Sequence, residues 1–243
     1  MDSVKLLAFS AILATAALAA PTRPVQEFPT RAGALKITPI NHATMLIEAG
    51  GKAIYVDPTS AGNYDGLPKA DLILITDIHG DHMDPKALPQ VQKSDTVIYA
   101  PEAVAKTVTA AKIIRNGESQ TVGDWKIEAI PMYNLKRGPS EGKLFHDKGR
   151  GDGYVVSYGG KRIYISGDTE GVPEMRALKN IDIAFVCMNL PYTMPPEEAA
   201  EAVRAFKPKV VYPYHYRGSD LKAFETALAG SGVEVKSIDW YYK

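Results

Sequence analysis

Two similar strand–turn–strand segments constrain the fold more than any other feature of this sequence. Residues 43–57 read ATMLIEAGGKAIYVD and residues 153–168 read GYVVSYGGKRIYISGD, with a shared Gly-Gly-Lys-x-Ile-Tyr core. Two apolar runs joined by Gly-Gly predict a β-hairpin, because glycine readily adopts the positive φ angles of a tight turn. The sequence therefore predicts two halves built on the same plan.

The segments that follow the hairpins also correspond between the halves. Apolar runs predict strands over 70–75 and 96–100 in the first half, and over 182–188 and 209–213 in the second. Capping residues and proline positions predict helices over 101–111, 196–206 and 219–229, the last with Ser219 as N-cap. Two such halves bury their apolar faces by packing sheet on sheet with helices outside. We therefore expect an α/β (α+β) fold, a four-layer αββα sandwich of two pseudo-symmetric halves.

The N-terminus and the charge balance indicate location and exclude some functions. Residues 1–20 combine Lys5, an apolar stretch over 6–18 and the pattern Ala17-Leu18-Ala19, which is typical of a cleaved signal peptide. We expect a periplasmic or secreted protein with no stable membrane insertion after cleavage; an uncleaved anchor is the alternative. A linker over 21–34 and a single domain over 35–243 should follow. The 28 basic and 28 acidic residues form no basic run, which argues against nucleic-acid binding.

Four candidate metal ligands follow the apolar run 72–75 within six residues: Asp77, His79, Asp81 and His82. A strand that ends in such a loop places ligands at the edge of a sheet. A polar turn is the alternative, but carboxylates and imidazoles at this density disfavour one another unless a cation neutralises them. Asp168 and His215 each follow a predicted strand of the second half. We expect both to join the same site. The lone Cys187 lies in an apolar run and is predicted to be buried rather than nucleophilic.

Three motifs in this order resemble those of the metallo-β-lactamase-fold hydrolases. They are Asp-x-His-x-Asp-His after a strand, Gly-Asp-Thr after a later hairpin and Pro-Tyr-His after a last strand. The resemblance runs from about Leu35 to the C-terminus. Within the superfamily the chain is most similar to the branch of ascorbate-phosphate lactonases and phospholipase-D-like phosphodiesterases, which also opens with an Asn/Gly-His-Ala hairpin leading to Tyr-Val-Asp-Pro.

The resemblance implies two metal positions bridged by Asp168. Asp81, His82 and His215 would hold the second ion, and the first ion would be held by Asp77, His79 and either Asn134 or His146. The family usually has histidine at the positions of Asp77 and Asn134. The carboxylate of Asp77 favours Mn²⁺ or Fe²⁺ as rivals to Zn²⁺, which we still expect. His146 is either the replacement ligand or a histidine that contacts substrate or solvent.

Three further residues are candidates for supporting roles. His42 and Asp57 flank the first hairpin, where they would orient a ligand by hydrogen bonding or merely satisfy the local backbone. Tyr192 would line the pocket. The segment 134–151 carries five positive and two negative charges. Its charge indicates either a bias toward anionic substrates or an ordinary solvated loop.

Two cations ~3.5–4 Å apart can share a hydroxide at neutral pH, with Asp168 bridging them and Asp81 orienting the hydroxide or accepting its proton. No Gly-x-Ser-x-Gly elbow is present to favour a serine hydrolase. We expect an exported metal-dependent hydrolase that cleaves a small ester, lactone or phosphodiester, in a chain compatible with a homo-oligomer. The alternatives are a β-lactamase-type amide hydrolase and a non-catalytic binding module on a degenerate fold.

Overall fold

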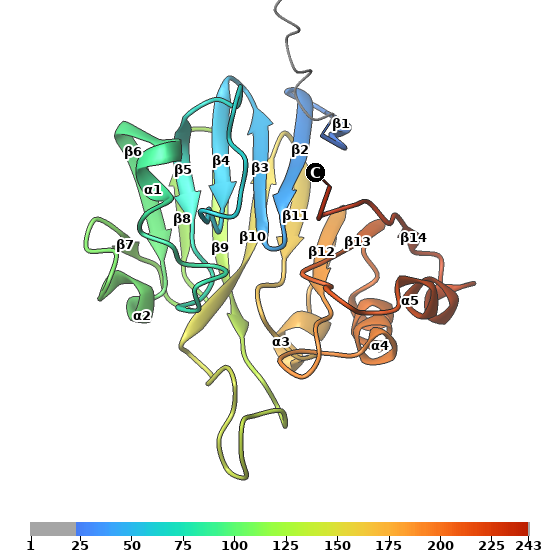
Figure 1. Ribbon diagram of the computed structural model, residues 1–243. Helices are drawn as coiled ribbons and strands as arrows, with labels where there is room; N and C mark the ends of the chain where they lie inside the picture. The colour runs from blue at the N-terminus through green and yellow to red at the C-terminus, as the bar shows by residue number, and fades with distance from the viewer. Residues whose placement is uncertain (1–22, 243) are drawn as a thin grey trace, which may run out of the picture.

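The computed structural model describes residues 23–242, so the expected signal peptide lies outside the described residues. These residues form two seven-stranded sheets packed face to face, with helices at the sides (Figure 1). The first sheet holds β1 Gln26–Thr30, β2 Gly33–Asn41, β3 Thr44–Ala49, β4 Lys52–Val56, β5 Ala70–Leu74, β6 Gln92–Ala100 and β7 Lys112–Ile113. The second holds β8 Ser119–Val122, β9 Trp125–Met132, β10 Gly151–Tyr158, β11 Lys161–Ile165, β12 Ile183–Cys187, β13 Val210–Tyr214 and β14 Glu234–Val235. The helices are α1 Leu88–Val91, α2 Glu102–Ala105, α3 Pro173–Arg176, α4 Pro196–Phe206 and α5 Leu221–Leu228.

The two sheets have the same strand order and the same pairing pattern. In the first, β1 to β4 pair antiparallel and β4 to β7 pair parallel. In the second, β8 to β11 pair antiparallel and β11 to β14 pair parallel. The two predicted hairpins, β3–β4 and β10–β11, occupy equivalent places, and their turn glycines all have positive φ. The expected fold of two pseudo-symmetric halves is confirmed.

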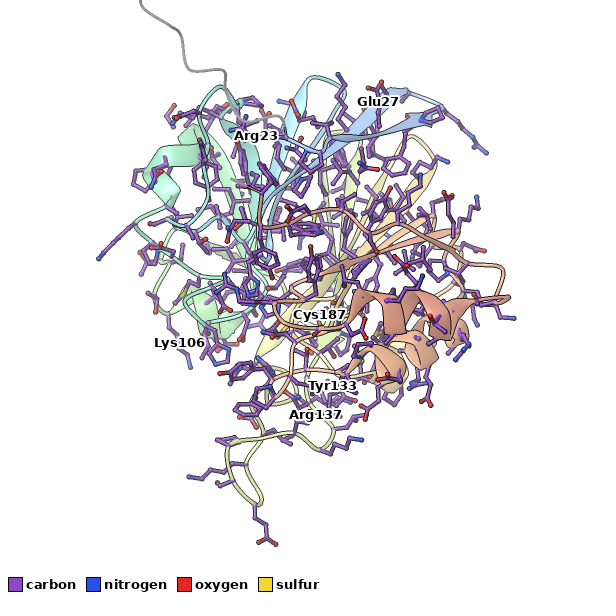
Figure 2. The ribbon with its side chains drawn as sticks, turned by 45° about the vertical axis from the view of Figure 1, so that its right-hand side comes forward. Arg23, Glu27, Lys106, Tyr133, Arg137 and Cys187 are labelled. Atoms are coloured by element: carbon purple, nitrogen blue, oxygen red, sulfur yellow. The ribbon has the colours of Figure 1, made fainter. Side chains whose placement is uncertain are left out.

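Side chains of the central strands alternate between two apolar layers. Along β4, Ile54 and Val56 face the core between the sheets, whereas Ala53 and Tyr55 pack in a separate cluster with residues of α1 and α2. Both faces of such a strand are buried, which explains its nearly continuous apolar sequence. The buried Cys187 belongs to the main core, and Figure 2 shows it in the interior.

The predicted helix over 196–206 is confirmed as α4, but two other predictions need correction. The helix expected over 101–111 ends after Ala105, where the run Thr107-Val108-Thr109 supplies β-branched side chains that disfavour a helix. The N-cap of α5 is Asp220, whose carboxylate accepts from the amide of Ala223 at 3.1 Å. Ser219 instead donates its hydroxyl to the carbonyl of Met188.

The linker expected over 21–34 is wrong from residue 26 onward. Residues 26–30 form β1, which pairs antiparallel with the start of β2. Pro29 lies within this strand, and an edge strand tolerates proline because one side of it needs no ladder hydrogen bonds. Phe28 also packs edge-on against Tyr212 of the other sheet at 6.4 Å between ring centroids, which fixes the strand. Among the described residues, no helix is long and apolar enough to cross a membrane.

Candidate metal centre

The candidate ligands converge where strands of both halves end. His42 lies in the β2–β3 turn, Asp57 follows β4, residues 77–82 follow β5, Asp168 follows β11 and His215 follows β13. His42, Asp57 and His215 have positive φ angles of 52°, 45° and 49°. Non-glycine residues rarely adopt such angles, and they concentrate at functional sites. The backbone at this edge is therefore shaped around the cluster of polar side chains.

His82 is held by the fully buried carboxylate of Asp57. The imidazole Nδ1 donates to Asp57 Oδ2 at 2.8 Å, and the Thr76 amide and hydroxyl donate to the same carboxylate at 2.8 and 2.7 Å. This arrangement leaves Nε2 of His82 as the atom that faces the site. Carboxylates hold metal-binding histidines in this way, so the geometry agrees with the orienting role expected for Asp57.

Asp168 lies at the centre of the cluster with its two oxygens facing different imidazoles. Its Oδ2 lies 3.3 Å from Nε2 of His82 and 3.4 Å from Nε2 of His146. Its Oδ1 lies 3.4 Å from Nε2 of His215. Asp168 therefore contacts imidazoles from both expected metal positions, because its Oδ2 lies between His82 and His146.

His146 reaches the site, and Asn134 holds it there. The Asn134 side-chain oxygen accepts from the backbone amide of His146 at 2.9 Å and contacts its Nδ1 at 2.5 Å. Since that oxygen is already engaged, the structure favours His146 over Asn134 as the ligand at this corner. Asn134 also donates its amide to the backbone carbonyl of Tyr192 at 2.9 Å.

Asp77 is fully buried and paired with a cation that the sequence did not single out. The Arg150 guanidinium donates to both of its oxygens, from Nε at 3.2 Å and from Nη2 at 3.1 Å. The Oδ2 atom that accepts from Nη2 also lies 2.7 Å from Nδ1 of His79. The Asp77–Arg150 pair carries no net charge. In this respect it is like the neutral histidine that the family usually has at the position of Asp77. The sequence did not distinguish Arg150 from the other four cations of the 134–151 segment.

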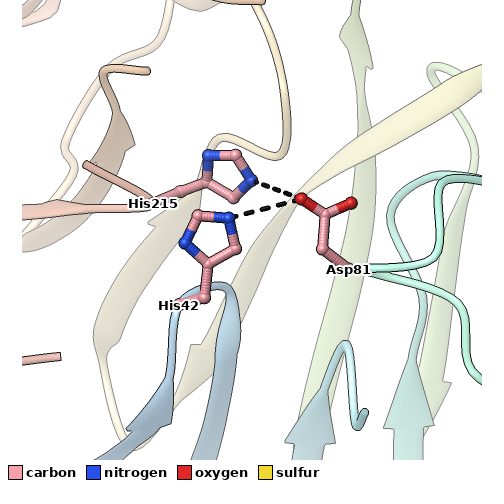
Figure 3. A group of neighbouring side chains, drawn as sticks. All are labelled: His42, Asp81 and His215. Atoms are coloured by element: carbon pink, nitrogen blue, oxygen red, sulfur yellow. Dashed lines mark hydrogen bonds and ion pairs between the residues drawn. The ribbon is translucent and has the colours of Figure 1, made fainter. Parts of the chain in front are cut away.

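Asp81 meets two closely packed histidines with tilted rings at the open side of the site. Figure 3 shows His42 and His215 pointing at the same carboxylate oxygen, with Nε2 distances of 3.3 and 3.4 Å. The rings of these two histidines lie 3.7 Å apart. Nδ1 of His42 lies 2.6 Å from the hydroxyl of Tyr241 near the C-terminus. Sequence reasoning missed Tyr241, although the aromatic run Trp240-Tyr241-Tyr242 offered a signal.

Charge coupling favours the ionised carboxylates of Asp77, Asp81 and Asp168, whereas burial raises the pKa of Asp57. Burial by itself would lower the pKa of His82, but Asp168 and Asp57 outweigh it and raise this pKa well above its usual value. Burial opposes ionisation of Asp168, yet His215 and His82 hold its pKa well below the usual range. Burial also opposes ionisation of Asp77, but the bond from His79 and the charges of His82 and Arg150 lower its pKa to about 2. The cluster therefore needs positive charge, which protons or a metal ion can supply.

The donor set fits a divalent metal better at one position than at the other. The buried Nε2 of His82, Nε2 of His146 and Oδ1 of Asp168 have no hydrogen-bond partner among the described residues. Ligands ~2.1 Å from one tetrahedral ion lie about 3.4 Å apart, and the contacts around Asp168 match that spacing. Asp77 and His79 lie at hydrogen-bonding distance instead, so their pairing would have to open before both could bind one ion. At the second position His82, Asp168 and His215 already have ligand atoms within 4.8 Å of one another, whereas Asp81 groups with His42 and His215.

The site opens into a cavity of about 300 Å³. It is lined by five candidate ligands and two aromatic residues: His79, Asp81, His146, Asp168, His215, Phe145 and Tyr192. The expected position of Tyr192 at the pocket is therefore observed, and Phe145 is an addition. A cavity of this size accommodates a small substrate, since ligand pockets span roughly 300–1,000 Å³.

Proteins with similar sequences carry names from one superfamily. A family model described as the beta-lactamase superfamily domain matches residues 36–215. A UPF0173 metal-dependent hydrolase of Pelotomaculum thermopropionicum is 32% identical over 222 residues, which cover 84% of this chain and 96% of that protein.

Solved structures give the same fold. A Parabacteroides distasonis protein assigned to the metal-dependent hydrolases is 43% identical with a TM-score of 0.85, and the match covers 89% of this chain and 98% of that one. YhfI of Bacillus subtilis, a metallo-β-lactamase fold protein, has a TM-score of 0.67 at 15% identity, with 82% of this chain and 89% of that chain covered. The second likeness shows the fold alone.

Proposed function

Since the chain belongs to the metallo-β-lactamase superfamily of metal-dependent hydrolases, we propose that it cleaves a small ester, lactone or phosphodiester at the His82–Asp168–His215 cluster. The observation that carries this proposal is the central Asp168, whose two oxygens lie 3.3–3.4 Å from the facing imidazoles. Water would attack the acyl or phosphoryl centre, the bond to the leaving oxygen would break, and the leaving oxygen would take up a proton.

We propose two divalent ions, with Zn²⁺ first among the candidates and Mn²⁺ or Fe²⁺ as rivals. Asp81, His82 and His215 would hold the second ion, Asp77, His79 and His146 the first, and Asp168 both. Ions bound in this way lower the pKa of water toward ~7 and stabilise a developing oxyanion. The second position should be the tighter one, because the first must compete with the Arg150–Asp77–His79 interactions.

The protein's own groups would hold the reacting atoms and move the proton. Asp57 keeps Nε2 of His82 aimed at the centre. The side chain of Asp81 is 47% exposed and borders the cavity, so it can reach the attacking water to orient it or accept its proton. His42 lies against Asp81 and would fix the direction of that carboxylate.

Metal content and hydrolysis together test this proposal. The metal-saturated wild type should contain two equivalents of metal and hydrolyse bis-p-nitrophenyl phosphate or a lactone faster than nitrocefin. His82→Ala should lose metal and activity together. Asp71→Asn is a suitable control, because Asp71 lies at the opposite end of β5 and contacts Lys52 and Lys93.

Other outcomes would point to the alternatives. Preferred cleavage of nitrocefin would indicate a β-lactamase-type hydrolase. Equal inertness of wild type and His82→Ala with Zn²⁺, Mn²⁺ or Fe²⁺ would indicate a binding module and end the hydrolase proposal.

We also propose export directed by residues 1–20, on the sequence pattern described above. N-terminal sequencing of the mature protein from fractionated cells should find a start near Pro21. A mature protein that retains Met1 in the soluble cytoplasmic fraction would contradict this.

A further inference from the structure

Apart from the candidate ligands, the lining of the cavity is aromatic. Phe145 and Tyr192 complete the lining, and their rings meet edge to face with centroids 5.0 Å apart. Tyr192 is 46% exposed, so its ring is open to an incoming molecule. Aromatic faces of this kind favour apolar or flat groups over anionic ones, because the ring face is electron-rich.

This aromatic wall is tied to the candidate ligand His146. Phe145 precedes His146 in the chain, and Asn134 binds both the His146 backbone and the carbonyl of Tyr192. The amide of Phe145 donates to the carbonyl of Arg137 at 3.1 Å. The wall is therefore held at a fixed distance from the reacting centre, which is what a specificity contact requires.

Apolar exposure continues outward on the same two segments. Leu135 and Leu190 are 53% and 52% exposed, each within two residues of Asn134 or Tyr192. Neither leucine lines the cavity itself, so the aromatic wall consists of Phe145 and Tyr192.

The positive charge of the 134–151 segment is largely balanced within the protein. Figure 2 places Arg137 at the base of the projecting loop, where its guanidinium bonds Glu170 and Glu198. The positive charge of the segment therefore gives little support for an anionic substrate. Four of the five cations contact carboxylates: Lys136 and Arg137 contact Glu198, Lys148 contacts Glu174, and Arg150 contacts Asp77.

We propose that the substrate carries an apolar, flat or short acyl group that packs on Phe145 and Tyr192 while its scissile bond lies at Asp168. The inference rests on the proposed function, because the same cavity must hold the reacting group. It names the substrate class as a neutral, apolar ester, lactone or aryl phosphodiester rather than a polyanionic one.

Binding of small phosphonates tests this wall without any turnover. Phenylphosphonate, methylphosphonate and phosphonoacetate share one anionic head and differ in an apolar ring, a methyl group and a carboxylate. Calorimetry on the Zn²⁺-loaded protein should show phenylphosphonate binding at least about tenfold tighter than methylphosphonate, the smallest discrimination that one methylene gives in an apolar pocket. Phosphonoacetate should show no such gain.

Substitutions in the wall should remove the preference. Tyr192→Ser should reduce the ratio of the phenylphosphonate affinity to the methylphosphonate affinity to about threefold or less. Tyr192→Phe should keep the wild-type ratio, because the ring and not the hydroxyl makes the contact. Phe145→Leu should reduce the ratio while the zinc content stays unchanged. Ile113→Ser is the matched control, since Ile113 is an exposed apolar residue of β7 outside the cavity.

Equal binding of the phenyl and methyl compounds, tighter binding of phosphonoacetate, or an undiminished ratio in Tyr192→Ser would overturn the inference. These results would leave the His82-dependent hydrolysis test untouched. A phenyl preference without His82-dependent hydrolysis would contradict the proposed function while supporting the aromatic wall.

Discussion

Replacing Asp57 with asparagine should weaken metal binding through the tautomer of His82. In the native site both oxygens of Asp57 accept hydrogen bonds, Oδ1 from the Thr76 amide and Oδ2 from His82 Nδ1. Asparagine keeps only one acceptor oxygen and places an NH₂ group at the other corner. The Thr76 backbone donor cannot change, whereas His82 can move its proton from Nδ1 to Nε2. The proton would then occupy the atom that faces the metal.

The expected loss follows from the position of Asp57 behind the ligand. Partners that orient a metal-binding histidine typically contribute 10–100-fold to metal affinity, or about 1.4–2.7 kcal/mol. Asp57 and His82 are both fully buried, so water cannot replace the lost acceptor. We expect the upper part of this range for Asp57→Asn.

Competition with a chromophoric chelator would measure the affinity for Zn²⁺ in wild type, Asp57→Asn and the control Asp71→Asn. Circular dichroism would verify that each variant is folded. Asp71→Asn should bind like wild type, since Asp71 contacts only groups at the far end of β5. An Asp57→Asn protein that is folded and binds Zn²⁺ with wild-type affinity would refute the tautomer argument.

Three other predictions concern stability and activity. Burial raises the pKa of Asp152 to about 7. The folded protein therefore holds a proton that the unfolded chain releases near pH ~4. The stability that results is fully present below pH ~4 and is lost as pH rises through ~7. The free energy of unfolding, measured with urea, should fall between pH 5 and 8 by ~2–3 kcal/mol less in Asp152→Asn than in wild type. Equal decreases in the two proteins would contradict this. Arg150→Met removes the guanidinium from the buried carboxylate of Asp77 and leaves His79 as its partner. This should cost the metal-free protein up to ~3–5 kcal/mol in the same assay, most of it recovered in Asp77→Asn/Arg150→Met; unchanged stability would show that the Asp77–Arg150 pair is unimportant. Tyr241→Phe removes the 2.6 Å contact to His42 and should lower kcat/KM up to about tenfold with little change in Tm, whereas an unchanged kcat/KM would exclude a positioning role.

Local sequence patterns were sufficient to predict much of the fold. The Gly-Gly hairpins, the apolar strands after them and helix α4 depend on turn chemistry, periodicity and proline position, which act over a few residues. The edge strand β1 was missed because Pro29 disfavours a strand locally, and its stability comes from pairing with β2 and from Phe28 packing on Tyr212. The end of α2 was misplaced because a short helix depends on its tertiary contacts more than on its propensity.

The sequence by itself also identified the residues that could bind metal, because a dense run of carboxylates and imidazoles after a buried strand has few other stable uses. Only the tertiary structure decided how these residues are arranged and which partners they contact. It placed His146 rather than Asn134 at the centre, paired Asp77 with Arg150 and brought Tyr241 to His42 from 199 residues away. A hydrogen bond forms over about 3 Å whatever the separation in sequence, so such partners are chosen by the way the two sheets pack.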